Sequence, residues 1–135
     1  MKHGVMATAT SLLSALLFSF HLADDVVRGM SPGGASNVVG ALVLVVWLYG
    51  ALVLAGRRSG YAVTLVLALL ASGVPVLHMT GPGLVGGGAG SGGVFFWVWT
   101  LLALQVTAMF SVILSARGLW SLRGGRPGPA PAPHS

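Results

Sequence analysis

Long apolar stretches alternate with short polar segments along the whole chain. Four stretches approach the roughly 20 residues that a helix needs to cross a hydrocarbon core of about 30 Å: residues 5–22, 38–55, 61–80 and 94–116. Membrane-spanning β-strands would be about half as long and would alternate apolar and polar positions. The pattern therefore predicts an all-α integral membrane protein, a four-helix bundle whose helices run up-down-up-down.

The segments between these stretches are rich in turn-forming residues. Residues 31–34 read Ser-Pro-Gly-Gly, and Ser36 or Asn37 is placed to cap the helix that follows. Residues 56–60 read Gly-Arg-Arg-Ser-Gly, a tight turn that predicts antiparallel neighbours on either side. Eight glycines among residues 81–93 predict a mobile loop. We expect one transmembrane domain over residues 1–123 and a disordered cytoplasmic tail over residues 124–135.

The composition supports a membrane location. Charged residues make up 7% of the chain and hydrophobic residues 55%, whereas a typical soluble domain has roughly 25% charged residues. There is no cysteine, which excludes disulfides, thiolate metal sites and thiol catalysis. The basic residues are scattered, without interleaved aromatics, so the expected partner is the lipid bilayer and not nucleic acid.

The basic residues predict the orientation of the bundle. In a four-span arrangement all but one fall on the same side; these are Lys2, Arg57, Arg58, Arg117, Arg123 and Arg126. Arg28 alone falls on the other side. Because basic residues concentrate in cytoplasmic segments, we expect a multi-pass protein of the cell membrane with both termini in the cytoplasm.

A cleaved signal peptide is the alternative interpretation of residues 1–23. Lys2, the apolar segment after it and the small residue Ala23 fit such a peptide. His21, however, would occupy a position where cleavage requires a small side chain, and the apolar segment is longer than usual. Cleavage would leave three spans.

Aromatic residues near the predicted helix ends are candidate interfacial anchors. They are Tyr61, Trp97, Trp99 and Trp120. Trp47 and Tyr49 lie too deep in their stretch for that role.

A polar face is predicted at the end of the first stretch. His21, Asp24, Asp25 and Arg28 are spaced i, i+3, i+4 and i+7, so they share one face if the helix continues that far. The two aspartates are the only acidic residues of the chain. Ionisable groups at membrane depth avoid lipid, so we expect this face to point into the bundle. Thr10 and Ser14 extend the same polar stripe towards the N-terminus.

Stripes of small and hydroxyl residues on the third and fourth stretches match that face. They comprise Thr64, Ala68, Ala71, Pro75 and His78, and then Thr100, Ala103, Thr107, Ser111 and Ser115. Small residues let helices approach closely, so we expect the stripes to pack together. At a rise of 1.5 Å per residue, His21 lies about 24 Å from the start of its stretch and His78 about 25 Å. The two histidines are therefore predicted at a similar depth on the outer side.

The sharpest functional hypothesis is a metal site at the outer ends of the first and third helices. Imidazole and carboxylate groups of His21, Asp24, Asp25 and His78 suit zinc, iron or copper. Three protein ligands and a water would leave an open position for chemistry or exchange. Haem held between His21 and His78 is a further alternative, although it leaves the acidic pair without a role.

Two other hypotheses remain open. Adjacent carboxylates near a histidine also suit a small proton- or cation-coupled transporter. Alternatively, an aspartate simply pairs with Arg28, and the protein is a structural or assembly subunit of a membrane complex.

The small residues Ala51 and Ala55 would permit a homo-oligomer. Gln105 is expected to form an interhelical hydrogen bond. The sequence identifies no enzymatic activity.

Overall fold

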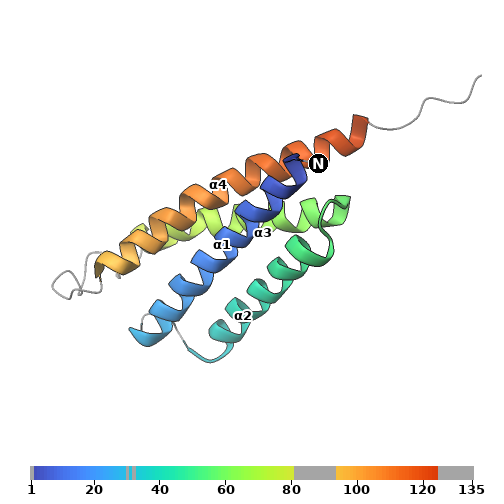
Figure 1. Cartoon of the computed structure of the whole chain (residues 1–135). Helices are drawn as coiled ribbons and strands as arrows, with labels where there is room; N and C mark the ends of the chain where they lie inside the picture. Colours follow the sequence, from blue (N-terminus) through green and yellow to red (C-terminus); the bar gives the residue numbers. More distant parts are fainter. Residues whose placement is uncertain (1, 30, 32, 81–93, 125–135) are drawn as a thin grey trace, which may run out of the picture.

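The fold is described by a computed structural model, which covers residues 2–29, 31, 33–80 and 94–124, without the side chains at positions 2, 3, 77–80, 94 and 124. Within these ranges the chain is helical and contains no strand (Figure 1). The elements are α1 (Lys2–Val27), α2 (Ala35–Leu48), the π-helical turn η1 (Tyr49–Val53), α3 (Arg58–Thr80) and α4 (Val94–Gly124). The all-α prediction is confirmed.

The described chain has four helices that are long and apolar enough to cross a membrane. They are Gly4–Val27, Ala35–Val53, Arg58–Val76 and Phe95–Arg123, and each overlaps one of the apolar stretches of the sequence. The second span combines α2 with η1. The glycine-rich segment 81–93 and the segment 125–135 of the predicted tail lie outside the described residues.

Small residues form most of the core. α4 packs along both α1 and α3, and α2 lies on the outside against α1 (Figure 1). Ala15, Ala68 and Ala108 are buried at the centre, so the helix backbones approach closely there. Leu104 and Trp47 are the largest fully buried side chains of the described residues. The expected packing of the stripes is confirmed in part. Most of their members are buried, namely Thr64, Ala68, Ala71, Thr100, Ser111 and Ser115, whereas Ala103 and Thr107 are only half-buried.

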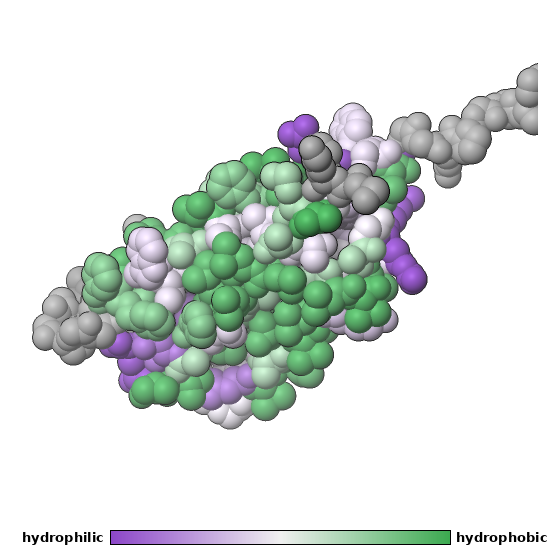
Figure 2. Space-filling model, viewed as in Figure 1, coloured by the Kyte–Doolittle hydropathy of each residue, from purple (hydrophilic) through white to green (hydrophobic). Residues whose placement is uncertain are grey.

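The outer surface of the bundle is apolar. α2 exposes a row of aliphatic residues, among them Val38, Leu42, Val45 and Val46. On the visible face, hydrophobic residues cover the middle and hydrophilic residues gather towards the two ends (Figure 2). An apolar surface of this kind is solvated by lipid tails, which is the arrangement expected of a membrane-spanning bundle.

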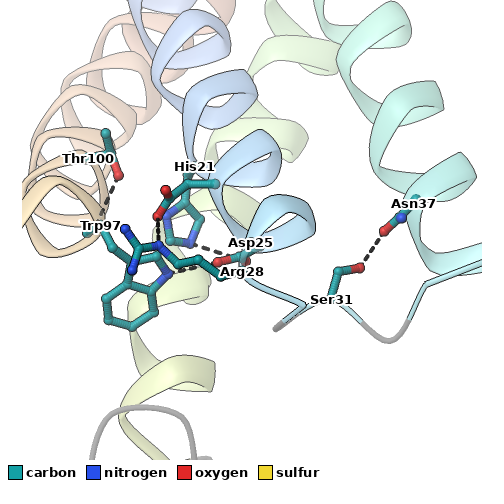
Figure 3. Close-up of polar contacts among 8 residues, drawn as sticks. His21, Asp25, Arg28, Ser31, Asn37, Trp97 and Thr100 are labelled. Carbon is teal, nitrogen blue, oxygen red and sulfur yellow. Dashed lines mark hydrogen bonds and ion pairs between the residues drawn. The ribbon is translucent and has the colours of Figure 1, made fainter. Parts of the chain in front are cut away.

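The start of α2 differs from the expected capping. α2 begins at Ala35, and the preceding Gly34 has a φ of 52°, a backbone conformation suited to glycine. No side chain caps this helix end. The Asn37 side chain instead accepts a hydrogen bond from the Ser31 hydroxyl (Figure 3). The capping prediction was wrong because the loop places Asn37 inside the first turn.

The turn between η1 and α3 depends on two glycines. Gly56 has a φ of 73°. A Cβ atom at Gly60 would lie 2.0 Å from the Leu54 carbonyl oxygen, so the two backbone segments touch directly. The π-helical turn precedes this contact, and the sequence pattern did not predict it.

Candidate functional site

α1 continues to Val27 and thereby places the predicted polar face on one helix. His21, Asp24 and Asp25 lie within α1, and Arg28 follows directly, with its backbone N–H bonded to the Asp24 carbonyl oxygen at 2.9 Å. Figure 3 shows the His21, Asp25 and Arg28 side chains at the end of α1, beside Trp97 of α4. The prediction that the face is helical and points into the bundle is confirmed for His21, which is 2% exposed.

The two aspartates have different partners. The Arg28 guanidinium donates to Asp24 through Nε, at 2.7 Å from Oδ2. Both side chains of this pair retain some exposure, 24% for Arg28 and 14% for Asp24. Asp24 is thus paired with the arginine four residues further along the chain.

Asp25 connects α1 to α4. The Trp97 indole N–H donates to Asp25 Oδ1 at 2.7 Å, and His21 Nε2 lies 3.7 Å from Oδ2. The imidazole and indole rings are adjacent, with centroids 5.7 Å apart and planes inclined by 39°. We call His21, Asp25 and Trp97 the outer cluster; its three side chains converge in Figure 3.

Trp97 is not the interfacial anchor expected from the sequence. It is 4% exposed and directed into the bundle, whereas Trp99 is 59% exposed. The buried Thr100 hydroxyl donates to the Trp97 carbonyl oxygen at 3.0 Å, so it bonds within the same first turns of α4. A buried indole N–H requires a hydrogen-bond acceptor, but the sequence did not indicate which of the tryptophans would be buried.

The proposed metal ligands are only partly brought together. His21 and Asp25 face one another, but Arg28 occupies the Asp24 carboxylate. Across the part of the chain with described side chains, no group of three or more His, Cys, Asp and Glu is arranged to hold a metal. His78 belongs to α3, but its side chain lies outside the described residues. The four-ligand site therefore remains a prediction, as does a haem between the two histidines.

Thr10 and Ser14 do not belong to the outer cluster. Ser14 lies seven residues before His21, about 10 Å along the helix axis. The Ser14 hydroxyl donates to the Thr10 carbonyl oxygen at 2.9 Å and lies 3.2 Å from the Ser111 hydroxyl of α4. The Thr10 hydroxyl donates to its own helix, to the Met6 carbonyl oxygen. The Ser14 hydroxyl therefore joins α1 to α4, and the Thr10 hydroxyl bonds within α1.

Further hydroxyl contacts connect the remaining helices. Trp47 of α2 donates through Nε1 to the Ser11 hydroxyl at 2.8 Å, so this tryptophan is a core residue. The Thr64 and Ser115 hydroxyls lie 3.0 Å apart between α3 and α4. Gln105 differs from expectation, because its buried Oε1 has no hydrogen-bond partner among the described residues.

Comparison of the chain with protein-family models, with curated proteins and with solved structures finds no significant match. The function must therefore be argued from the residues of this chain.

Proposed function

We propose that the chain is a multi-pass protein of the cell membrane, with helices running up-down-up-down and both termini in the cytoplasm. The depth of two polar positions supports this. Trp97 lies beside the Asp25 carboxylate, and Arg117 follows twenty residues later on α4. At 1.5 Å per residue the two are about 30 Å apart, the thickness of a hydrocarbon core. The outer cluster then lies at one interface and the basic residues at the other.

We further propose that the outer cluster is a proton-binding site that controls the packing of α1 against α4. The observation that carries this is the double engagement of Asp25. One carboxylate oxygen accepts the Trp97 N–H and the other faces the buried His21 imidazole. Histidine is the side chain that normally changes charge between pH 5 and 8. Its protonation would add an ion pair to the carboxylate that holds α4.

Few charged groups other than Asp25 surround His21. The nearby charged groups on α1 are Asp24 and Arg28, which pair with each other. α4 contributes the uncharged indole of Trp97. His78 of α3 is the remaining titratable residue that the sequence predicts at this depth. A proton arriving at His21 therefore changes the charge beside Asp25 directly. Proton-coupled transport or pH-dependent assembly would both use such a change.

Tryptophan fluorescence tests the proton site directly. A protonated imidazole quenches an adjacent indole, so we expect the emission of Trp97 to fall reversibly as the pH is lowered from 8 to 5 in lipid nanodiscs. Subtracting the emission of Trp97→Phe isolates this residue from the other tryptophans. The pH response should disappear in His21→Gln, while Asp24→Asn should retain it. A response that is absent, or equal in His21→Gln, would contradict the proposal.

A metal ion is the second candidate ligand of the outer cluster. His21 Nε2 and Asp25 Oδ2 are 3.7 Å apart, a separation that one ion can bridge with ligand distances of roughly 2.0–2.2 Å. The Trp97 indole donates a hydrogen bond to the other carboxylate oxygen, as neighbouring donors commonly do to carboxylates that bind a metal. Metal analysis of purified protein, beside His21→Ala and His78→Ala, separates the two candidates. Equal, negligible metal in all three samples would exclude a stable metal site.

A further inference from the structure

A second polar feature lies at the other end of α4. A cavity of about 180 Å³ is formed between α3 and α4. Its lining residues are Tyr61, Leu114, Arg117, Gly118 and Ser121. The α4 residues are spaced over two turns on one face of the helix. We call this feature the Arg117 pocket.

Gly118 gives the pocket its shape. A Cβ atom at this position would lie 2.5 Å from the Tyr61 ring, so the ring lies directly on the α4 backbone. The Ser121 hydroxyl, one turn further on, donates to the Gly118 carbonyl oxygen at 2.9 Å. The aromatic ring thus forms one wall and the helix the other. Arg117 supplies the charged group of the lining.

Among the residues that the structure describes, no acidic side chain pairs with the Arg117 cation. Asp24 and Asp25 are the only acidic residues of the chain. Asp24 pairs with Arg28, and Asp25 belongs to the outer cluster. Arg117 is exposed, as are the other arginines of the helix ends on this side, which are Arg57, Arg58 and Arg123. An anion of the surrounding membrane is therefore a candidate counter-charge for this end of the described helices.

The depth of the pocket indicates the source of that charge. Arg117 lies twenty residues, or about 30 Å, along α4 from Trp97, which places its guanidinium at the opposite headgroup level. Leu114 lies one turn deeper, where acyl chains begin. In such a pocket the Arg117 guanidinium can contact the phosphate of a lipid while Leu114 contacts its acyl chain.

We propose that the Arg117 pocket binds the phosphate of an anionic phospholipid, with the acyl chain against Leu114 and Tyr61. Arginine recognises phosphate through paired N–H donors, and basic pockets between membrane helices are suited to anionic headgroups. Inorganic phosphate offers the same oxygens but lacks the apolar part that the pocket accommodates. This inference uses the membrane location proposed above and is independent of the proton site.

Quenching of tryptophan fluorescence by brominated lipid provides the assay. Trp120 lies one turn from Arg117 and is 78% exposed, so it reports lipid at this end of α4. The full chain in phosphatidylcholine nanodiscs is titrated with brominated phosphatidylglycerol or brominated phosphatidylcholine. The difference between the protein and Trp120→Phe isolates the local signal. We expect preferential quenching by phosphatidylglycerol.

The matched variants are Arg117→Gln and Arg123→Gln, which remove the same charge from the same helix. One basic residue near an anionic surface contributes a factor of about five in binding, and a specific phosphate contact adds to that. We therefore expect Arg117→Gln to lower the preference for phosphatidylglycerol by more than five-fold, and Arg123→Gln by about five-fold or less. Equal losses would overturn the proposal in favour of diffuse attraction.

Two further outcomes test the identity of the ligand. Ser121→Phe fills the mouth of the pocket at an exposed position, and it should reduce the preference while leaving the net charge unchanged. Its failure to do so would overturn the pocket assignment even if Arg117→Gln does not fold. Millimolar inorganic phosphate should leave the quenching unchanged. Displacement of the lipid signal by phosphate would assign the pocket to soluble phosphate instead.

Discussion

Trp97→Phe should weaken the packing of α1 against α4 by a measurable amount. The substitution removes the indole N–H that donates to Asp25 at 2.7 Å and keeps an aromatic ring beside His21. Interhelical hydrogen bonds in membranes contribute about 0.6 kcal/mol on average and about 1.7 kcal/mol at most. Hydrogen bonds to charged groups in proteins contribute roughly 1.5–3 kcal/mol. Because the acceptor is a carboxylate, we expect a loss near the top of the membrane range, about 1.5–1.7 kcal/mol in the free energy of unfolding.

Reversible unfolding in mixed micelles with increasing dodecyl sulfate provides the measurement. Trp99→Phe is the matched control, since it makes the same change two residues along α4 at a side chain that is 59% exposed. A double-mutant cycle with Asp25→Ala then isolates the pairwise contribution. Equal effects of Trp97→Phe and Trp99→Phe, or a coupling energy with Asp25 close to zero, would show that the Trp97–Asp25 hydrogen bond does not hold α1 against α4.

Three further predictions use the same unfolding assay. Ser14→Ala removes a hydroxyl contact to α4 and should cost about 0.6 kcal/mol, whereas Ser19→Ala, which loses a bond only within α1, should cost less. Gly60→Ala should destabilise the protein by on the order of 1–3 kcal/mol, because the added Cβ would meet the Leu54 backbone. Gly73→Ala has open space around it and should stabilise α3 by about 0.5–1 kcal/mol. A greater stability of Gly60→Ala than of Gly73→Ala would contradict this packing. Asp24→Asn should cost only about 0.5 kcal/mol, as expected for a partly exposed i, i+4 pair, and a loss as large as that of Trp97→Phe would show that the two aspartates act together.

The helices were predictable from the sequence because membrane solvation imposes a strong pattern on it. Each helix needs an apolar stretch of sufficient length, and each overlaps such a stretch. The ends of the helices were less predictable. The polar residues after Leu22 read as the end of a span, but α1 continues to Val27 since its acidic residues find partners at the bundle end. The turn at η1 depends on the backbone contact at Gly60, which no periodicity reveals.

The candidate site was predictable only along one helix. Helical spacing places His21, Asp24 and Asp25 on one face, and the i, i+4 relation of Asp24 to Arg28 suggests that pair. The contact between Asp25 and Trp97 joins residues 72 positions apart, so it depends on how the helices pack. Amphipathic tryptophan is common at interfaces and in cores alike, and its sequence context alone did not distinguish the two environments.

The separation of charge along the bundle has an electrical consequence. The acidic pair lies at one end of the chain's helices, and Arg57, Arg58, Arg117 and Arg123 have no acidic neighbour at the other. In the proposed orientation the arginine end faces the negative side of the membrane. Moving one arginine charge to the positive side would cost about 2.3 kcal/mol for each 100 mV of membrane potential. The potential across the membrane would therefore act as a topological constraint, and collapse of that potential during insertion should increase the fraction of inverted molecules.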